Sequence, residues 1–376
     1  MLKDIFNNKS PLKHDVKLLV LVTTSRCNSR CRMCEIWKDD AAIDMSLDKI
    51  SEIINSPYIR NSLEEIIVGG GEPTLVKHFP EIFSVAFREV KHLKHISFAT
   101  NSIIPAASLV EQILIQRKIV KREDVNISIV LSLDGFKKTH DEIRGIKGAF
   151  DKVMENYFTL KALQSKYNFG VAFNYTVQKY NVENGDAYFV LDMAEKTLLP
   201  IRFSLVIEND FMTKNLEFSQ VGYDTQNREE YIKFFSEANR RSQEGRILYE
   251  IGMYYDQLVK QIQLNKRLVP CLFKGRKALF VNYDANVYIC GRTKAGLIGS
   301  IDDLGKQGLV ENASNNILKI CDTCLINCAP GGKLYQLYSV LLEDGPVELA
   351  KLIYLVANKR FNRIKRLYYE YKNVVY

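Results

Sequence analysis

Three cysteines near the start of the chain restrict what it can fold into and bind more than any other feature. Cys27, Cys31 and Cys34 lie within eight residues, in the run Cys-Asn-Ser-Arg-Cys-Arg-Met-Cys, and the next cysteine is Cys271. Iron–sulfur clusters are ordinarily held by four cysteine thiolates. Three thiolates therefore predict a 4Fe-4S cluster with one iron left open to bind another molecule. The alternative is a zinc site, which usually combines a CxxC pair with a distant second pair.

The segments on either side of these cysteines favour a cluster that binds a ligand. Residues 17–23, Lys-Leu-Leu-Val-Leu-Val-Thr, form an apolar run typical of a strand buried on both faces, so the cysteines follow its C-terminal end. A second run at 64–68 leads into Gly69-Gly-Gly-Glu-Pro73, where glycines let the backbone approach a ligand. A glycine triplet alone would also fit a tight strand-to-helix turn. After a CxxxCxxC loop, it predicts a binding loop.

The CxxxCxxC run followed by a GGEP segment resembles the radical S-adenosylmethionine (radical SAM) superfamily. In that family the open iron chelates the amino and carboxylate groups of SAM. An electron from the cluster then cleaves SAM to methionine and a 5'-deoxyadenosyl radical, which removes a hydrogen atom from the substrate. The resemblance implies that the SAM amino group meets the backbone at Gly70, Gly71, Glu72 and Pro73. It also implies a flavodoxin- or ferredoxin-type reductant as a partner.

Six apolar runs alternate with helical patterns, such as those at 47–54 and 150–157, along the first part of the chain. The runs are residues 17–23, 64–68, 95–100, 126–131, 171–177 and 201–207. Strands that alternate with helices predict βα units and a parallel sheet. The resemblance implies an α/β fold, a partial (β/α)6 TIM-like barrel over residues 15–208. The cysteines, the glycines and the turn after Ser132 would then lie at the C-terminal ends of the strands, where parallel barrels carry their reactive groups.

Further residues resemble SAM-binding segments of the family. The stretch that begins at Ser132 and includes Arg144 is similar to the segment after the fourth strand of SPASM-type enzymes, which implies that these two residues bind the SAM carboxylate. The planar fork of an arginine suits a carboxylate, although Arg144 alone would also fit a surface residue that caps a helix. The resemblance implies that Met33 occupies the position where the family has an apolar or aromatic residue against the adenine, whereas on its own it would be ordinary core packing. Asp134 and Asn101 are candidates for the ribose, with a turn-forming role as the alternative for each.

The other five cysteines all lie in the last third of the chain. They are Cys271, Cys290, Cys321, Cys324 and Cys328. Their spacing resembles the SPASM/twitch extension, which carries auxiliary iron–sulfur clusters. A full SPASM pattern uses more cysteines for two clusters, so the resemblance implies one auxiliary 4Fe-4S cluster here.

Five thiols for four ligand positions leave one spare. The twitch-like assignment uses Cys271, Cys290, Cys321 and Cys324. It leaves Cys328 free, as a candidate hydrogen-atom donor to a substrate radical. In the alternative, Cys328 is a ligand and one cysteine of the Cys321–Cys324 pair is spare.

Two other interpretations of the C-terminal cysteines remain open. A zinc ribbon shares their spacing. A disulfide network is disfavoured, because the chain lacks a secretory signal and a SAM-cleaving cluster needs a reducing compartment. The family's glycine five residues before the second cysteine is Ala285 in this chain, a departure that concerns a turn and not a ligand.

Length and composition fit about two domains, since the chain has 376 residues and 47% apolar content. We expect a helical bridge at 209–270 across the open edge of the barrel, a SPASM/twitch-like domain at 271–335 and basic helices at 336–376. The chain has no apolar stretch long enough to span a bilayer. These features predict a cytoplasmic protein.

The net charge of +8 is concentrated near the C-terminus. From residue 351 onward one acid, Glu370, accompanies a set of basic residues. These are Lys351, Lys359, Arg360, Arg363, Lys365, Arg366 and Lys372. Apolar residues between them describe a basic amphipathic helix that could contact an anionic membrane surface or an acidic partner. The alternative is a helix packed on the barrel with a solvated basic face. No nucleic acid partner is expected, because no known binding motif accompanies the charge.

The resemblance implies several possible substrates. Oxidation or cross-linking of a peptide is the first expectation, because many SPASM/twitch relatives modify precursor peptides and an auxiliary cluster can accept an electron. Against it, the barrel begins almost directly after Met1, which leaves no room for the leader-binding domain of many peptide maturases. The runner-up is dehydrogenation or epimerisation of a sugar, an aminocyclitol or another small metabolite. A non-enzymatic iron–sulfur electron carrier or sensor is the competing class, although a carrier has no need of the residues from Gly70 to Pro73 or of Arg144.

Overall fold

The computed structural model describes residues 16–39, 42–214, 216–224, 226–247, 254–268, 271–306 and 308–325. In these residues nine strands form one sheet with the order β6-β5-β4-β3-β2-β1-β7-β8-β9. The strands are β1 (Leu18–Val22), β2 (Glu65–Gly69), β3 (His95–Thr100), β4 (Asn126–Ser132), β5 (Gly170–Val177), β6 (Ile201–Leu205), β7 (Ala278–Val281), β8 (Val287–Tyr288) and β9 (Leu297–Gly299). No helix in the described ranges is long and apolar enough to cross a membrane.

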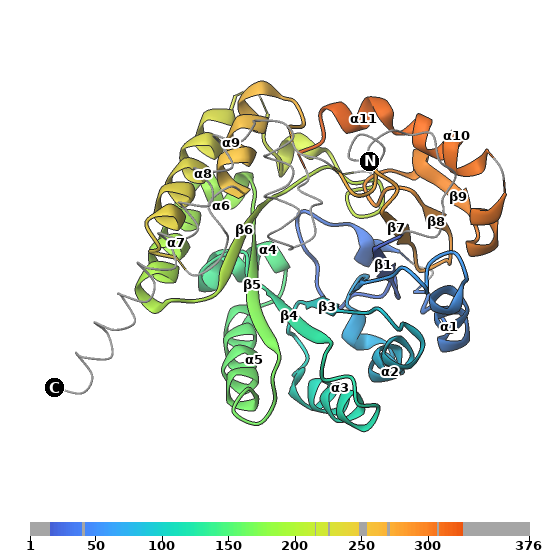
Figure 1. Cartoon of the computed structure of the whole chain (residues 1–376). Helices are drawn as coiled ribbons and strands as arrows, with labels where there is room; N and C mark the ends of the chain where they lie inside the picture. The colour runs from blue at the N-terminus through green and yellow to red at the C-terminus, as the bar shows by residue number, and fades with distance from the viewer. Residues whose placement is uncertain are drawn as a thin grey trace.

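Strands β1 to β6 are parallel, each paired with its neighbour in chain order, and helices cover their outer side (Figure 1). The helices between them are α1 (Leu47–Asn55), α2 (Phe79–Glu89), α3 (Ala107–Ile119), α4 (Lys137–Arg144), α5 (Ala149–Leu163), α6 (Lys179–Glu183) and α7 (Asp186–Thr197). The strands do not close into a ring. The predicted α/β class, with a parallel sheet in a partial barrel, is confirmed, and the six predicted runs agree with β1–β6 to within two residues.

The two faces of the parallel sheet differ in composition. One face is apolar and buried beneath the helices, with residues such as Ile66, Phe98, Ile129 and Phe173 in the main core. The other face lines the inside of the barrel, and on β4–β6 its residues are small or polar and only half-buried. They are Ser128, Val130, Ser132, Ala172, Asn174, Thr176, Arg202 and Ser204. This part of the barrel interior can therefore receive a polar ligand.

The inner face of β1 is covered instead by an apolar cluster. Leu18 and Val22 pack there with Phe280 and Tyr288 of the C-terminal strands. Phe211, from the loop after β6, packs against both rings, with its ring centroid 4.7 Å from that of Phe280 and 4.9 Å from that of Tyr288. The barrel interior is thus filled on one side and open on the other.

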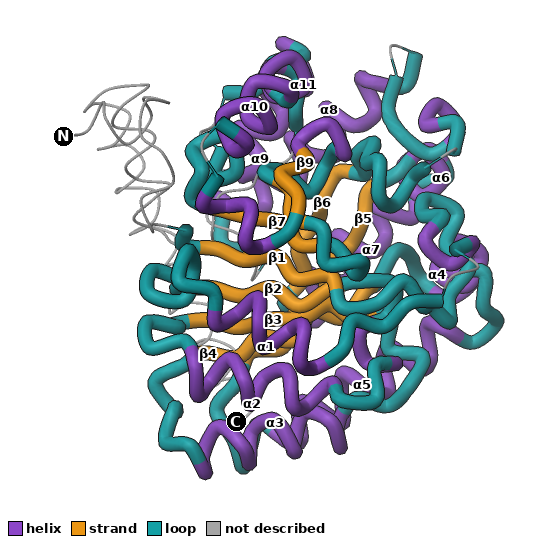
Figure 2. Tube along the Cα trace, turned by 90° about the vertical axis from the view of Figure 1, so that its right-hand side faces the viewer, coloured by secondary structure: helices purple, strands orange, loops and turns teal. Residues whose placement is uncertain are grey.

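Strand β7 extends the barrel sheet, because it pairs with β1 in parallel from Leu18↔Ala278 to Leu21↔Val281. Figure 2 shows β7, β1, β2, β3 and β4 side by side in that order. Strands β8 and β9 continue the sheet in antiparallel pairings. They are followed by α10 (Leu309–Asn316) and α11 (Leu318–Asp322).

At the other end of the sheet, α8 (Arg228–Gln243) and α9 (Tyr254–Leu264) lie beside β6. The hydroxyl of Tyr255 accepts a hydrogen bond from the backbone N–H of Phe203, at 3.1 Å. The guanidinium of Arg202 stacks on the Tyr254 ring, 4.6 Å from its centroid. Helix α9 therefore covers the strand at the open edge of the barrel, where a helical bridge was expected. Cys328 and the basic segment 336–376 lie outside the described residues, and the domain boundaries stay predictions.

Candidate functional site

The loop that carries Cys27, Cys31 and Cys34 leaves the C-terminal end of β1 and is held against the end of α4. The backbone N–H of Arg30 donates to the carbonyl of Arg144, and that of Arg32 donates to the carbonyl of Ile143, both at 2.9 Å. Gly145 ends α4 with a φ of 66°, and a Cβ at this position would lie 2.7 Å from the Arg30 carbonyl oxygen. Glycine therefore allows α4 to approach the cysteine loop closely.

The loop after β2, residues 69–73, packs against the same cysteine loop through backbone contacts, and we call it the glycine loop. Gly71 N–H donates to the Thr24 carbonyl at 2.9 Å, and Glu72 N–H donates to the Arg26 carbonyl at 2.8 Å. A Cβ on Gly71 would lie 2.2 Å from the Arg26 carbonyl oxygen, and one on Gly70 would lie 2.6 Å from that of Thr24. The glycines are thus required to join the two loops, whether or not their backbone also meets SAM.

Hydrogen bonds of the Glu72 side chain connect the glycine loop to the residue after β3. Its side chain is 1% exposed and accepts hydrogen bonds from the Asn101 backbone N–H at 2.7 Å and the Thr74 hydroxyl at 2.6 Å. Burial raises the pKa of this carboxyl, while these hydrogen bonds act in the opposite direction. The Asn101 side chain in turn reaches the cysteine loop, where its amide donates to Asn28 at 2.7 Å and approaches the Cys27 sulfur at 3.9 Å.

Arg144 and Asp134 form a buried ion pair next to Cys31. The Arg144 guanidinium pairs with the Asp134 carboxylate through one nitrogen and approaches the Cys31 sulfur, at 3.7 Å, through another. Asp134 is fully buried and also accepts the Thr176 backbone N–H at 2.9 Å. Burial alone would lower the pKa of Arg144, but Asp134 and Cys31 raise it above its ordinary value, so the group stays a cation. Arg144 is therefore fixed with its donors towards the cysteine loop.

The three N-terminal thiols have the surroundings of a cluster site. Cys31 and Cys34 are each 8% exposed, and burial raises the pKa of Cys27 to about 11 and that of Cys34 to about 12. Buried thiols that resist ionisation gain thiolate character when they bind a metal. The Ser29 N–H donates to the Cys27 sulfur at 3.5 Å, as expected for a thiolate ligand. These residues fit the open 4Fe-4S cluster implied by the sequence.

A single zinc ion fits the cysteines less well. Zinc bound by thiolates at about 2.3 Å brings their sulfur atoms to within about 4 Å of one another. Among the described residues, no group of three or more Cys, His, Asp or Glu side chains is close enough to hold one metal ion. The seven described cysteines are all free thiols, so no disulfide joins them in this structure.

For Met33 and Ser132, the expected contact with SAM stays a prediction. Ser132 is the last residue of β4, and its half-buried side chain lies on the inner face. Met33 accepts a contact from the Gln178 side-chain amide at 3.6 Å. Gln178 was not predicted. It is fully buried directly after β5, and its Oε1 has no hydrogen-bond partner among the described residues, so it can accept from a ligand beside Met33.

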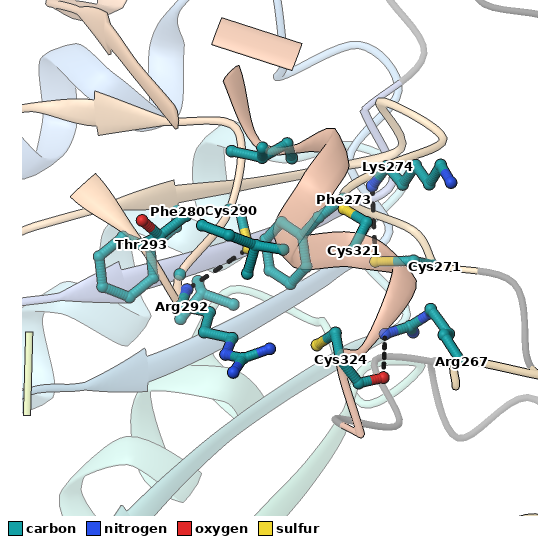
Figure 3. Close-up of a pocket in the computed structure, with 14 residues that line it drawn as sticks. Arg267, Cys271, Phe273, Lys274, Phe280, Cys290, Arg292, Thr293, Cys321 and Cys324 are labelled. Carbon is teal, nitrogen blue, oxygen red and sulfur yellow. Dashed lines mark hydrogen bonds between the residues drawn. The ribbon is translucent and has the colours of Figure 1, made fainter. Parts of the chain in front are cut away.

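The C-terminal cysteines Cys271, Cys290, Cys321 and Cys324 line one cavity of about 190 Å³ (Figure 3). They come from the segment before β7, the second residue after β8, α11 and the turn after α11. The remaining walls are mostly apolar and include Val20, on the inner face of β1. We call this space the cysteine cavity, and it shares the β1 strand with the N-terminal cysteine loop.

The thiols of the cysteine cavity also suit a cluster. Burial raises the pKa of Cys290 to about 12 and that of Cys321 to about 11. Backbone N–H groups donate to two of the sulfur atoms, Lys274 to Cys271 and Arg292 to Cys290, each at 3.4 Å. Three cationic side chains line the cavity, those of Arg267, Lys274 and Arg292. Positive charge and N–H donors near sulfur stabilise a reduced, more negative cluster.

The loop after β6 connects the two cysteine groups, and we call residues 208–213 the bridging loop. The Met212 carbonyl accepts from the backbone N–H of Glu35, next to Cys34, at 2.6 Å. Asp210 N–H donates to the Arg292 carbonyl at 2.9 Å, and the Asn209 side chain donates to the Gly291 carbonyl at 2.8 Å, both within two residues of Cys290. One short loop thus fixes the separation between the N-terminal and C-terminal groups.

These features define an open parallel barrel with a loop of three closely spaced cysteines after its first strand. Residues 21–184 match the sequence profile of the Radical SAM superfamily. Over these residues the barrel is similar to radical SAM domains, and proteins with this domain use SAM and a 4Fe-4S cluster.

Curated relatives with similar sequences have diverse names. The Fe-coproporphyrin III synthase of Methanosarcina barkeri is 30% identical over 181 residues, 47% of this chain and 40% of the relative. A GTP 3',8-cyclase of Campylobacter fetus is 28% identical and covers 54% of this chain and 59% of its own. The sporulation killing factor maturation protein SkfB of Bacillus subtilis is 25% identical and covers 43% of this chain and 36% of its own. The chain thus spans roughly two fifths to three fifths of these relatives.

Among solved structures, native anSMEcpe with bound AdoMet is similar over 79% of this chain and 82% of its own, with a TM-score of 0.57 and 18% identity. The complex of anSMEcpe with AdoMet and the Cp18Cys peptide gives a TM-score of 0.55 at 18% identity. At this identity the likeness concerns the fold. It extends beyond the barrel, because it covers more of the chain than residues 21–184.

Proposed function

We propose that the chain is a radical SAM enzyme that cleaves SAM reductively and oxidises or cross-links a peptide at the mouth of its barrel. The observation that carries the proposal is the position of two cysteine groups on one barrel. Cys27, Cys31 and Cys34 follow β1, and the cysteine cavity lies against Val20 on the inner face of the same strand. A cluster in the cysteine cavity would accept the electron that a substrate radical releases on oxidation.

SAM at the open iron supplies the radical that abstracts a hydrogen atom. Arg144, held by Asp134, offers donors for a carboxylate beside Cys31. The Gln178 amide oxygen, without a partner in the described structure, can accept from the ligand next to Met33. The half-buried polar side chains on β4–β6 would orient the substrate. The apolar cluster around Phe211 keeps water out of the space between the cysteine groups.

Two relatives support a peptide substrate. SkfB is named a maturation protein of the sporulation killing factor, and anSMEcpe was solved with peptides. The alternative is dehydrogenation or epimerisation of a small polar metabolite. The GTP 3',8-cyclases favour that alternative, because their names describe a reaction of one small molecule.

Anaerobically reconstituted full-length protein should hold about eight irons, four per cluster, and should form 5'-deoxyadenosine from SAM and dithionite. No 5'-deoxyadenosine from iron-loaded protein would overturn the enzyme proposal. An iron content of about four, or zinc in the C-terminal group, would overturn the auxiliary cluster.

The fate of one hydrogen separates oxidation from epimerisation, once neighbouring genes supply a candidate substrate. In deuterated water, oxidation should give a product lighter by two hydrogens and without label. Epimerisation through a cysteine donor such as Cys328 should instead give an isomer with one deuterium, because thiol protons exchange with water. Loss of that label in Cys328→Ala would establish the alternative.

A further inference from the structure

A second cavity, of about 320 Å³, opens where β6 ends. Its walls come from the residues after β6, the start of α8, the end of α9 and the segment after Cys321. It shares Arg292 with the cysteine cavity, so the two spaces are neighbours. Because β6 belongs to the parallel barrel, its C-terminal end lies on the reactive face. The cavity is therefore placed where a substrate would extend away from the reacting atom.

Two arginines from distant parts of the chain line this space, and we call it the arginine cavity. Arg228 begins α8, where one of its terminal nitrogens donates to the Gln263 carbonyl and its buried Nε has no hydrogen-bond partner in the described residues. Arg292 donates from Nε to the Glu208 carbonyl at 3.2 Å, and its buried Nη1 likewise has no partner there. A buried donor without an acceptor costs free energy, so both groups favour an anionic ligand.

Tyr223 lies close to both arginines in this cavity. Burial raises the pKa of its hydroxyl, and the positive charges of Arg228 and Arg292 both act to lower it. Both guanidinium groups are thus within electrostatic range of one tyrosine that lines the same cavity. A ligand next to this hydroxyl would face both cations at once.

The cavity also contains two acids, Asp224 and Glu208. The Asp224 carboxylate already has hydrogen-bond partners, because its Oδ1 accepts the backbone N–H groups of Gln226 at 2.7 Å and Asn227 at 3.0 Å. Glu208 is exposed, and its backbone carbonyl is the group that accepts from Arg292. Within the described part of the chain, no ion pair joins either acid to either arginine. The guanidinium groups remain available, but the acids reduce the total positive charge.

We propose that the arginine cavity binds a carboxylate of the substrate, next to an apolar group that packs on Val206, Ile207 and Phe218. A single negative charge suits this cavity better than a dianionic phosphate, because two acids share it with two arginines. Arginine donors arranged as forks match a carboxylate. The inference rests on the proposed function, since a substrate subsite presupposes a reaction at the barrel mouth. It deepens that function by naming a substrate with a free carboxylate and an apolar neighbour, such as a peptide terminus.

Calorimetric titration of the reconstituted full-length protein, without SAM or reductant, tests the inference. N-acetyl-leucine carries a carboxylate and an apolar side chain, and N-acetyl-leucinamide differs from it mainly by lacking the charge. We expect the acid to bind at least about tenfold more tightly than the amide, the loss expected when a charge-assisted hydrogen bond is removed. Inorganic phosphate should bind more weakly than the acid. Equal affinities for acid and amide, no binding of the acid at millimolar concentrations, or tighter binding of phosphate would overturn the carboxylate assignment.

Variants of the two cavity arginines, with a control variant on the same helix, test whether N-acetyl-leucine binds in the arginine cavity. Arg228→Gln and Arg292→Gln should each weaken N-acetyl-leucine at least about tenfold. Arg240→Gln should not, because Arg240 lies on the same helix but pairs with Glu237 and Glu244 at the surface. Iron content and thermal midpoint check that each variant folds. If a glutamine variant does not fold, the lysine variant, which keeps the charge but loses the fork, should show an intermediate loss. Unchanged affinity in the arginine variants would overturn the site, and this result does not depend on SAM cleavage.

Discussion

The two cysteine groups of this molecule are built in different ways. Cys27, Cys31 and Cys34 lie on one loop, which is joined to α4 and to the glycine loop by backbone hydrogen bonds and glycine contacts. The cysteine cavity takes its thiols from separate segments, held by apolar packing around β7 and α11. Beside the first group, the positive charge of Arg144 is neutralised by Asp134. The cysteine cavity, in contrast, is lined by cationic side chains. The first site is therefore specified locally and the second by the tertiary fold.

Removing thiols should separate the two groups most clearly. Cys27→Ala/Cys31→Ala/Cys34→Ala should abolish SAM cleavage and leave about four of the eight irons. Cys271→Ala/Cys290→Ala should also leave about four, but 5'-deoxyadenosine should still form, because the SAM site is on the other loop. Iron analysis and chromatography measure both. Loss of SAM cleavage in the second variant as well would show that the groups depend on each other for folding.

Arg144→Ala should have the next largest effect, because it leaves Asp134 buried without its partner. Loss of one member of a buried pair costs about 3–5 kcal/mol. Lys274→Ala, in the cysteine cavity, removes an exposed charge 3.8 Å from Asp322 and should cost at most about 1 kcal/mol. Anaerobic denaturant unfolding measures both.

SAM affinity is better measured in Arg144→Ala/Asp134→Ala, which removes the pair without a stranded carboxylate. Weaker SAM binding with both clusters assembled supports a role of the Arg144–Asp134 pair in binding SAM. Wild-type affinity would show that the arginine serves only to organise the cysteine loop.

Glycine substitutions sharpen the comparison of backbone packing. Gly71→Ala places a Cβ 2.2 Å from the Arg26 carbonyl oxygen, and we expect a loss of about 1–3 kcal/mol from this overpacking. Gly275→Ala, between Cys271 and β7, meets the Cys271 carbonyl oxygen at 3.2 Å, which needs only a small shift. Its loss of unfolding free energy should be smaller. Equal losses would mean that both loops are equally constrained.

The smallest expected effect concerns the turn between β7 and β8. Ala285 has a φ of 62°, in the left-handed region of the backbone, which favours glycine. Its N–H donates to the Asn282 carbonyl at 2.8 Å, so the turn keeps its geometry despite the strain. Ala285→Gly should raise the free energy of unfolding by about 1 kcal/mol. A decrease would show that the glycine's added freedom in the unfolded chain outweighs the relieved strain.

The sequence predicted most of the barrel because buried parallel strands are continuous apolar runs, and all six runs became strands. It did not predict that β7 pairs with β1, since a parallel pairing between residues 18 and 278 leaves no periodic signal in either segment. The bridging loop was also missed, because its bonds to Glu35 and Arg292 depend on backbone atoms.

The site was predictable where a motif is contiguous. The cysteine spacing together with the glycine triplet that follows it pointed to one binding region, the resemblance pointed to Arg144, and the roles of these residues towards SAM stay predictions. Spacing could not reveal that Asp134 holds this arginine, because the contact requires the turn after β4 to face α4. Gln178 follows a predicted strand, and a buried polar residue at that position was the available signal. Arg228 and Arg292 are far apart in sequence, so only the fold shows that they share a cavity.

The contact between Tyr255 and Phe203 has a consequence for how the protein behaves at high concentration. A barrel that does not close leaves β6 as an edge strand, and unpaired N–H groups on such a strand can recruit a strand from another molecule. The Tyr255 hydroxyl occupies the Phe203 N–H, and α9 covers the strand beside it. The aromatic helix thus protects an open barrel from strand-to-strand aggregation while the interior stays accessible to substrate.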